Sequence, residues 1–216
     1  MSGQPLVAGL AAGTALVAVV DWVAVHRGAR GVETWAKPAT LAGLLLVAVV
    51  AGAPGSVAGW WLLVALACGL AGDVLLLEHS SSRFLGGLAA FLLGHLAYLV
   101  CFGLVGLDHH GWLWPAALPL LGASWVAARV VPAARRRSGA AMAVPVAAYV
   151  VVIGTMLLAG FATGRWAVAL GAAVFVVSDS LLALNEFVRP RPDQRLAVMV
   201  TYHLGQALIV LGVLAG

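Results

Sequence analysis

Long apolar runs, separated by short segments that carry charge, proline or glycine, dominate the pattern of this chain. A membrane-crossing helix needs roughly 20 mostly apolar residues to cover about 30 Å of hydrocarbon. Eight runs fit this requirement, at residues 6–25, 38–53, 57–77, 84–106, 112–131, 140–160, 165–187 and 196–214. The pattern predicts an all-α fold, a polytopic membrane helix bundle with eight transmembrane helices that forms one integral-membrane domain over residues 1–216.

The polar connections between these runs are short, and the longest are residues 26–37, 78–83, 132–139 and 188–195. We expect the second helix to begin at Pro38, because the first turn of a helix tolerates proline. Lys37 then lies at the mouth of the bundle. We expect no domain outside the membrane, so any chemistry takes place inside the bundle or at its mouth.

Composition strengthens this prediction: 63% of the residues are hydrophobic, 9% are charged, and the mean hydropathy is +1.05. A soluble domain has about 45–50% apolar and about 25% charged residues. These values exclude a water-soluble domain, a disordered chain and a nucleic-acid-binding module. Membrane lipids are therefore the expected surroundings, and nucleic acid is not an expected partner.

The positive charges are distributed unevenly between the two ends of the predicted helices. Of the 12 Lys and Arg residues, 11 lie in the connections that follow the first, third, fifth and seventh runs. Cytoplasmic loops of membrane proteins carry the excess of Lys and Arg. Both termini are therefore predicted to face outward, and the Ala-, Gly- and Arg-rich composition favours the inner membrane of a bacterium.

Several polar residues lie within the apolar runs, where an ionisable side chain costs several kcal/mol and indicates function. Counted from the helix ends, all of them fall in the cytoplasmic half of the membrane. The members that stand out are Asp73, His95, Asp179, His203 and Gln206, accompanied by Tyr98, Tyr202 and Ser178.

The two aspartates, Asp73 and Asp179, are the strongest candidates, because buried carboxylates must be protonated, paired or solvated. By contrast, Asp21 and Glu78 are expected at cytoplasmic helix ends, in contact with water. His95 and Tyr98 share a helix face.

The third and seventh runs resemble each other. Each ends near an aspartate, and each is followed by a helix with polar groups at a similar separation: 22 residues from Asp73 to His95 and 23 from Asp179 to Tyr202. A parallel duplication of four helices plus four explains this correspondence.

Six short patterns follow one another on the predicted helices: Lys37-Pro38, Gly72-Asp73-x-x-Leu76, Phe84-x-x-Gly87-x-x-x-Phe91-x-x-x-His95-x-x-Tyr98, Tyr149 with Met156, Gly171-x-x-x-Phe175-x-x-Ser178-Asp179, and Tyr202-x-x-x-Gln206. With these patterns, over most of its length, the chain resembles the YhhN family of multi-span membrane proteins, to which the animal lysoplasmalogenases belong. The resemblance implies hydrolysis of the vinyl ether of lysoplasmalogen. Its products are a fatty aldehyde and a glycerophospho-ethanolamine or glycerophospho-choline.

The polar residues suit such a reaction, which needs a general acid, a base that positions water, and negative charge near a developing oxocarbenium ion. Our hypothesis is that Asp73 and Asp179 divide these roles and that His95 shuttles protons or orients a group. The lysolipid substrate is expected to contact a set of polar side chains: Lys37 at its phosphate, Tyr98, Tyr202, Gln206, Ser178 and Glu78. No cofactor and no metal are expected.

Two other functions remain open at this point. Asp73, His95, Asp179 and His203 are acceptable zinc ligand types, so a metal-dependent intramembrane hydrolase is one alternative. A proton-coupled membrane transporter is the other, since intramembrane Asp and His residues also relay protons.

Overall fold

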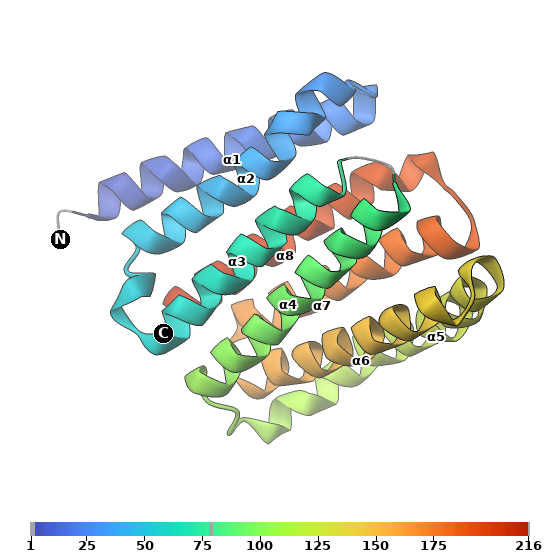
Figure 1. Cartoon of the computed structure of the whole chain (residues 1–216). Coiled ribbons are helices and arrows are strands. Elements are labelled where there is room, and N and C mark those ends of the chain that lie inside the picture. Colours follow the sequence, from blue (N-terminus) through green and yellow to red (C-terminus); the bar gives the residue numbers. More distant parts are fainter. Residues whose placement is uncertain (1–2, 78–79, 216) are drawn as a thin grey trace. The chain divides into compact units, whose positions relative to one another are not determined.

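The computed structural model describes residues 3–77 and 80–215, and these residues form helices and no strands (Figure 1). In this part of the chain, 8 helices are long and apolar enough to cross a membrane, which confirms the predicted class of fold. They are α1 (Gln4–Arg27), α2 (Arg30–Val50), α3 (Val57–Leu75), α4 (Ser81–Val105), α5 (Leu113–Ser138), α6 (Ala140–Ala162), α7 (Trp166–Ala183) and α8 (Arg195–Leu214).

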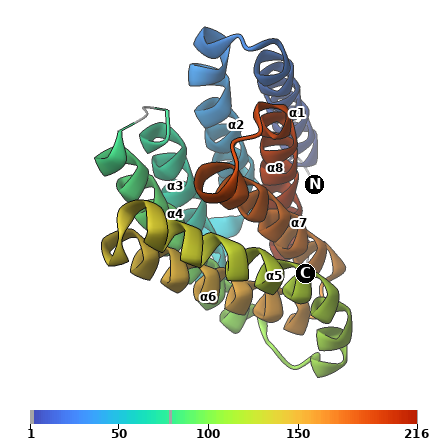
Figure 2. The same ribbon diagram turned by 90° about the vertical axis from the view of Figure 1, so that its right-hand side faces the viewer.

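The chain forms two compact units, which we describe separately. Unit 1 comprises residues 1–105 and 210–216, and unit 2 comprises residues 106–209. In unit 1, α1 lies along α2, α2 along α3, and α3 along α4; the last of these pairs is seen from a second side in Figure 2. In unit 2, α5 and α7 both pack against α6.

Helix α2 begins at Arg30, well before the predicted start at Pro38, and this prediction was wrong. Gly28 ends α1 in a left-handed conformation with φ 68°, and the amide of Ala29 donates a 2.8 Å hydrogen bond to the Ala24 carbonyl. This tight turn lets the chain reverse within two residues, so α2 restarts at once. Pro38 consequently lies inside the helix, and Lys37 is held on a regular helical turn.

Helix α5 also runs further than the predicted end at residue 131, and it continues through the arginine run to Ser138. Gly139, with φ 72°, then connects it directly to α6. The connections expected at residues 26–37 and 132–139 are therefore mostly helical. Hydropathy marks where a helix leaves the hydrocarbon, whereas arginine is a good helix former and lets the backbone hydrogen bonds continue into water.

Large apolar side chains on the outside of the helices fit a lipid environment. Leu118 and Leu121 on α5 are 79% and 68% exposed, and Trp114 near the start of the same helix is 84% exposed. A soluble protein does not leave such a surface open. The buried positions, in contrast, hold the polar side chains discussed next.

Candidate functional site

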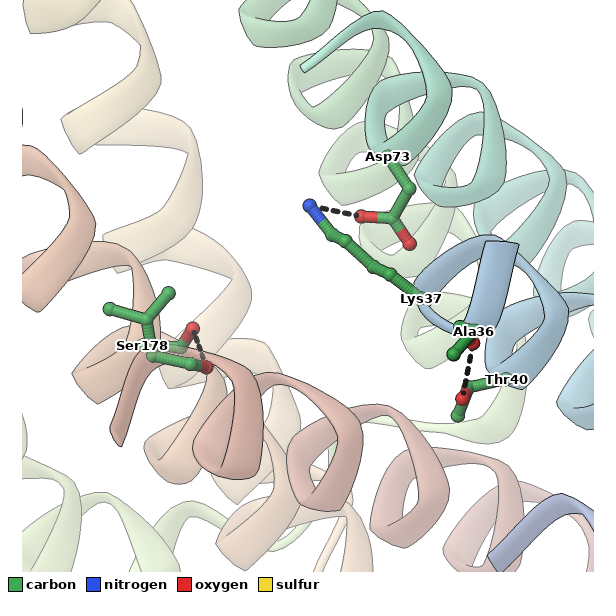
Figure 3. A network of polar contacts seen from close by, with 6 residues as sticks. Ala36, Lys37, Thr40, Asp73 and Ser178 are labelled. Atoms are coloured by element: carbon green, nitrogen blue, oxygen red, sulfur yellow. Dashed lines mark hydrogen bonds and ion pairs between the residues drawn. The ribbon is translucent and has the colours of Figure 1, made fainter. Parts of the chain in front are cut away.

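In unit 1, an ion pair joins α2 to α3. The Lys37 ammonium lies 3.2 Å from Oδ1 of Asp73, and the two side chains are 9% and 0% exposed (Figure 3). A buried charge requires a compensating partner, and here each residue supplies it for the other. The Lys37 side chain is buried against the carboxylate, and its predicted place at the mouth of the bundle stays a prediction. Its predicted contact with a phosphate stays a prediction.

The position of Asp73 depends on its glycine neighbour. A Cβ on Gly72 would lie 2.6 Å from the Phe91 ring, so the absence of a side chain lets α4 pack closely against α3. Asp73 lies near the end of α3, which ends at Leu75. The carboxylate is therefore close to the end of its own helix and still enclosed by neighbouring helices.

His95 on α4 is 2% exposed and its Nδ1 lies 2.6 Å from the Phe91 carbonyl oxygen. A carbonyl oxygen only accepts, so Nδ1 donates, and the neutral ring then has its lone pair on Nε2. Gly94 packs near Cys68, and the two helices are antiparallel, so His95 lies about six residues, or about 9 Å, along α3 from Asp73. His95 and Asp73 thus lie on the same helix pair at different depths.

Tyr98 belongs to the core of unit 1. It is 1% exposed, and its ring stacks on Phe102 with a centroid separation of 5.8 Å. Its predicted role in binding stays a prediction.

In unit 2, the second aspartate has a hydroxyl partner. The Tyr149 hydroxyl on α6 donates a hydrogen bond to Oδ2 of Asp179 on α7. The two side chains are half-buried. Because the hydroxyl donates to one of the two carboxyl oxygens, this contact orients the carboxyl group. The sequence analysis included Tyr149 in the family pattern but not among the site residues. Tyr149 and Asp179 are 30 positions apart on different helices, so helical periodicity could not show that they meet.

The remaining polar residues of unit 2 line the contact between α7 and α8. The Ser178 hydroxyl donates to the Val198 carbonyl at 2.9 Å, also drawn in Figure 3. Tyr202 is 4% exposed and meets Phe175 edge to face, with ring centroids 5.6 Å apart. Gln206 and His203 are 1% and 3% exposed. All of these predicted polar groups are therefore at buried positions of α7 and α8.

Asp21 on α1 corrects another expectation. It was expected at a helix end in water, but it is 0% exposed. It belongs to a buried stripe of α1 that includes Thr14 and Ala18, whose spacing of three and four residues is visible in the sequence. Distance from the predicted helix end was therefore a poorer guide to its burial than helical periodicity.

The predicted site residues are thus distributed over both units. Lys37, Asp73, His95 and Tyr98 lie in unit 1, and Tyr202, Gln206, Ser178 and Asp179 lie in unit 2. Glu78 lies outside the described residues. Within residues 3–77 and 80–215, no three His, Cys, Asp or Glu side chains are grouped as metal ligands. The approach of Asp73 to Asp179 stays a prediction.

Comparison with known proteins places these residues in a family context. The model of the YhhN family matches residues 32–213. The chain is 36% identical over 162 residues to the rat protein named lysoplasmalogenase TMEM86B, covering 75% of this chain and 65% of the rat protein. It is 35% identical over 150 residues to the human protein of the same name, covering 69% and 62%.

A third relative, human lysoplasmalogenase TMEM86A, is 34% identical over 158 residues, which are 68% of this chain and 62% of the relative. The chain therefore spans somewhat under two thirds of the length of the rat protein, with 65% covered. No solved structure matches significantly.

Proposed function

Because the chain belongs to the YhhN family, we propose that this integral membrane protein hydrolyses ether lysolipids, and that its substrate is lysoplasmalogen. The relatives of the chain carry the name lysoplasmalogenase, and the polar groups inside its membrane helices are of the kinds that acid–base hydrolysis needs.

One observation supports the proposal most strongly. Two aspartates within membrane helices each have a specific partner, Lys37 for Asp73 and Tyr149 for Asp179. Ordinary packing of membrane helices uses small residues and neutral hydrogen-bonding groups. A carboxyl group in a membrane helix costs free energy even when it has a partner, and such a group therefore indicates proton transfer or binding.

The proposed reaction begins with a proton transferred to the β-carbon of the vinyl ether, which leaves an oxocarbenium cation. Water adds to the cationic carbon and loses a proton to a base, giving a hemiacetal. The hemiacetal collapses to a fatty aldehyde and a glycerophospho-ethanolamine or glycerophospho-choline. The carboxyl groups act at the first two of these steps.

The two partners suggest how the roles are divided. Asp73 is paired with the Lys37 ammonium, and we assign it as the base that positions water and faces the developing cation. Oδ2 of Asp179 accepts from Tyr149, so Oδ1 is left to carry the proton that the β-carbon receives. This division requires both carboxyl groups to face one substrate, and that approach is part of the proposal.

The test is aldehyde release by the purified protein in detergent, with lysoplasmalogen as substrate and a saturated ether-linked lysolipid as the negative control. We expect Asp73→Asn and Asp179→Asn each to lower turnover about a hundredfold or more. Tyr149→Phe removes the hydrogen bond that orients the carboxyl group of Asp179 and is expected to lower turnover about tenfold. Asp108→Asn, at an exposed carboxylate, is the matched control and retains activity.

Near-normal turnover in both aspartate variants contradicts the assignment of the residues. Turnover that a chelator abolishes and zinc restores indicates the metal-dependent alternative instead. A folded protein that releases no aldehyde from lysoplasmalogen refutes the proposed substrate.

A further inference from the structure

Arg129 on α5 is an exposed cation inside a membrane helix, and the proposed reaction gives it no role. It lies within the apolar run that the sequence predicts to end at residue 131. Among residues 3–77 and 80–215, no carboxylate forms an ion pair with it. A cation on the outside of a membrane helix costs free energy unless water or an anion compensates it.

The guanidinium of Arg129 points back along α5, away from the nearer end of the helix. Its Cζ lies 3.4 Å from the centroid of the Trp125 ring, and its Nη1 lies 3.5 Å from the Trp125 carbonyl oxygen. Long cationic side chains near a helix end ordinarily extend toward water, which here lies beyond the arginine run that ends α5. The Trp125 ring instead holds this cation about one turn deeper, with several N–H donors left for a ligand.

The exposed face of α5 joins this cation to a long apolar surface. Positions at intervals of three or four residues share one face of a helix. Going from Arg129 toward the start of α5, the side chains on its face are Trp125, Leu121, Leu118 and Trp114, which are 57%, 68%, 79% and 84% exposed. Arg129 and Leu118 are 11 positions apart, or about 16 Å. This surface has the length of a lipid acyl chain and ends at a cation.

The charge of α5 has one sign. Its sequence contains no aspartate or glutamate and four exposed arginines: Arg129, Arg135, Arg136 and Arg137. Arg137 donates to the Glu186 carbonyl at 2.7 Å, whereas Arg136 lies seven positions from Arg129 on the same face. A zwitterionic headgroup would bring an ammonium group into this positive field, and an anionic one brings only negative charge. Guanidinium groups bind phosphate oxygens through paired donors.

We propose that this face of α5 binds an anionic phospholipid of the membrane, with the headgroup phosphate on Arg129 and one acyl chain along Leu121 and Leu118. Trp125 is a positioning residue, because its ring holds the guanidinium above the acyl-chain surface. The arginines that end α5 favour a headgroup with a net negative charge. The inference does not depend on the proposed reaction.

The test uses a phosphatidylglycerol that carries a photoreactive diazirine in its acyl chain, added to the full-length protein in nanodiscs of phosphatidylcholine. Peptide mass spectrometry then maps the labelled residues. The internal control is Val151 on α6, which is 67% exposed on a helix without charged residues. We expect about fivefold more label around Leu121 than around Val151. Unlabelled phosphatidylglycerol is expected to compete for the α5 site, and free glycerol phosphate is not.

Arg129→Gln is expected to lower the labelling of α5 about fivefold and to leave that of α6 unchanged. Trp125→Leu keeps every cation and is expected to lower it as well, because the guanidinium then turns toward water, whereas Trp125→Phe retains a ring and most of the labelling. The matched control is Arg30→Gln, which removes an exposed cation from α2 and is expected to change nothing at α5. Thermal unfolding checks that all four variants are folded.

Equal labelling of α5 and α6 in the wild-type protein overturns the inference, and so does unchanged labelling of α5 in Arg129→Gln. If free glycerol phosphate competes as well as phosphatidylglycerol, the site binds a free anion and the assignment to a lipid is wrong. A dimer whose α5 takes up no label shows that a second copy of the chain covers this face, which also overturns the inference.

Discussion

Lys37 and Asp73 show how a membrane helix accommodates two charges. Both side chains are at most 9% exposed, and their charged atoms are 3.2 Å apart. Removing both charges from such a pair is often nearly neutral for stability, whereas removing one leaves the other buried and uncompensated. The pair is therefore better explained by function than by stability.

This asymmetry gives a prediction for the pair. We expect Lys37→Met to lower the free energy of unfolding by about 3 kcal/mol, because Asp73 then lacks its countercharge. The double variant Lys37→Met with Asp73→Asn is expected to recover most of this loss. Unfolding in mixed detergent micelles measures both values.

Arg136→Met is the control for this cycle, because it removes a cation from an exposed position. It is expected to change the free energy of unfolding by less than about 0.5 kcal/mol. A double variant as unstable as Lys37→Met alone contradicts the pairing.

At the scale of the helices, small residues decide how closely α7 and α8 approach. A Cβ on Gly171 would lie 2.8 Å from the Ile209 amide nitrogen and 2.9 Å from the Gly205 carbonyl oxygen. A Cβ on Gly205 would lie 3.0 Å from the Phe175 amide nitrogen. Backbone meets backbone here, so neither helix can yield by moving a side chain. This close packing holds Ser178 against α8.

We expect Gly171→Ala to destabilise unit 2 by about 1–3 kcal/mol, because the added methyl group forces the two backbones apart. The matched control is Gly122→Ala on α5, where an added Cβ meets nothing within 4 Å. It is expected to be neutral or slightly stabilising, since alanine favours helix over glycine. Thermal unfolding of both purified variants provides the measurement, and equal effects contradict the prediction.

At the scale of the whole molecule, charge asymmetry predicts the orientation in the membrane. Arg135, Arg136 and Arg137 lie in the last turns of α5, on the side that the excess of cations assigns to the cytoplasm. Gly111, before the same helix, lies on the side that carries few cations. The prediction is therefore that both termini face outward, in the inner membrane of a bacterium.

Cysteine labelling tests this orientation, after Cys68 and Cys101 have been replaced by alanine. In intact spheroplasts, a maleimide that cannot cross membranes is expected to label Gly111→Cys, and to label Arg136→Cys only after permeabilisation. Because the two positions flank one helix, each variant serves as the control for the other. The opposite pattern reverses the topology.

The sequence by itself determined the class of fold and the number of helices. Runs of apolar residues have no stable alternative in lipid, because each backbone polar group must be satisfied within its own helix. The sequence also placed Asp73 and Asp179 inside helices as the candidates for chemistry, and their roles stay proposals.

Only the tertiary structure decided which groups meet. Lys37 and Asp73 are 36 positions apart, and Tyr149 and Asp179 are 30 apart. These contacts depend on helix rotation and on close approaches at glycines such as Gly72 and Gly171, which hydropathy does not encode. The start of α2 at Arg30 and the end of α5 at Ser138 also could not be predicted from hydropathy. Capping and backbone geometry determine where a helix ends, whereas the apolar pattern reports only the depth of the hydrocarbon.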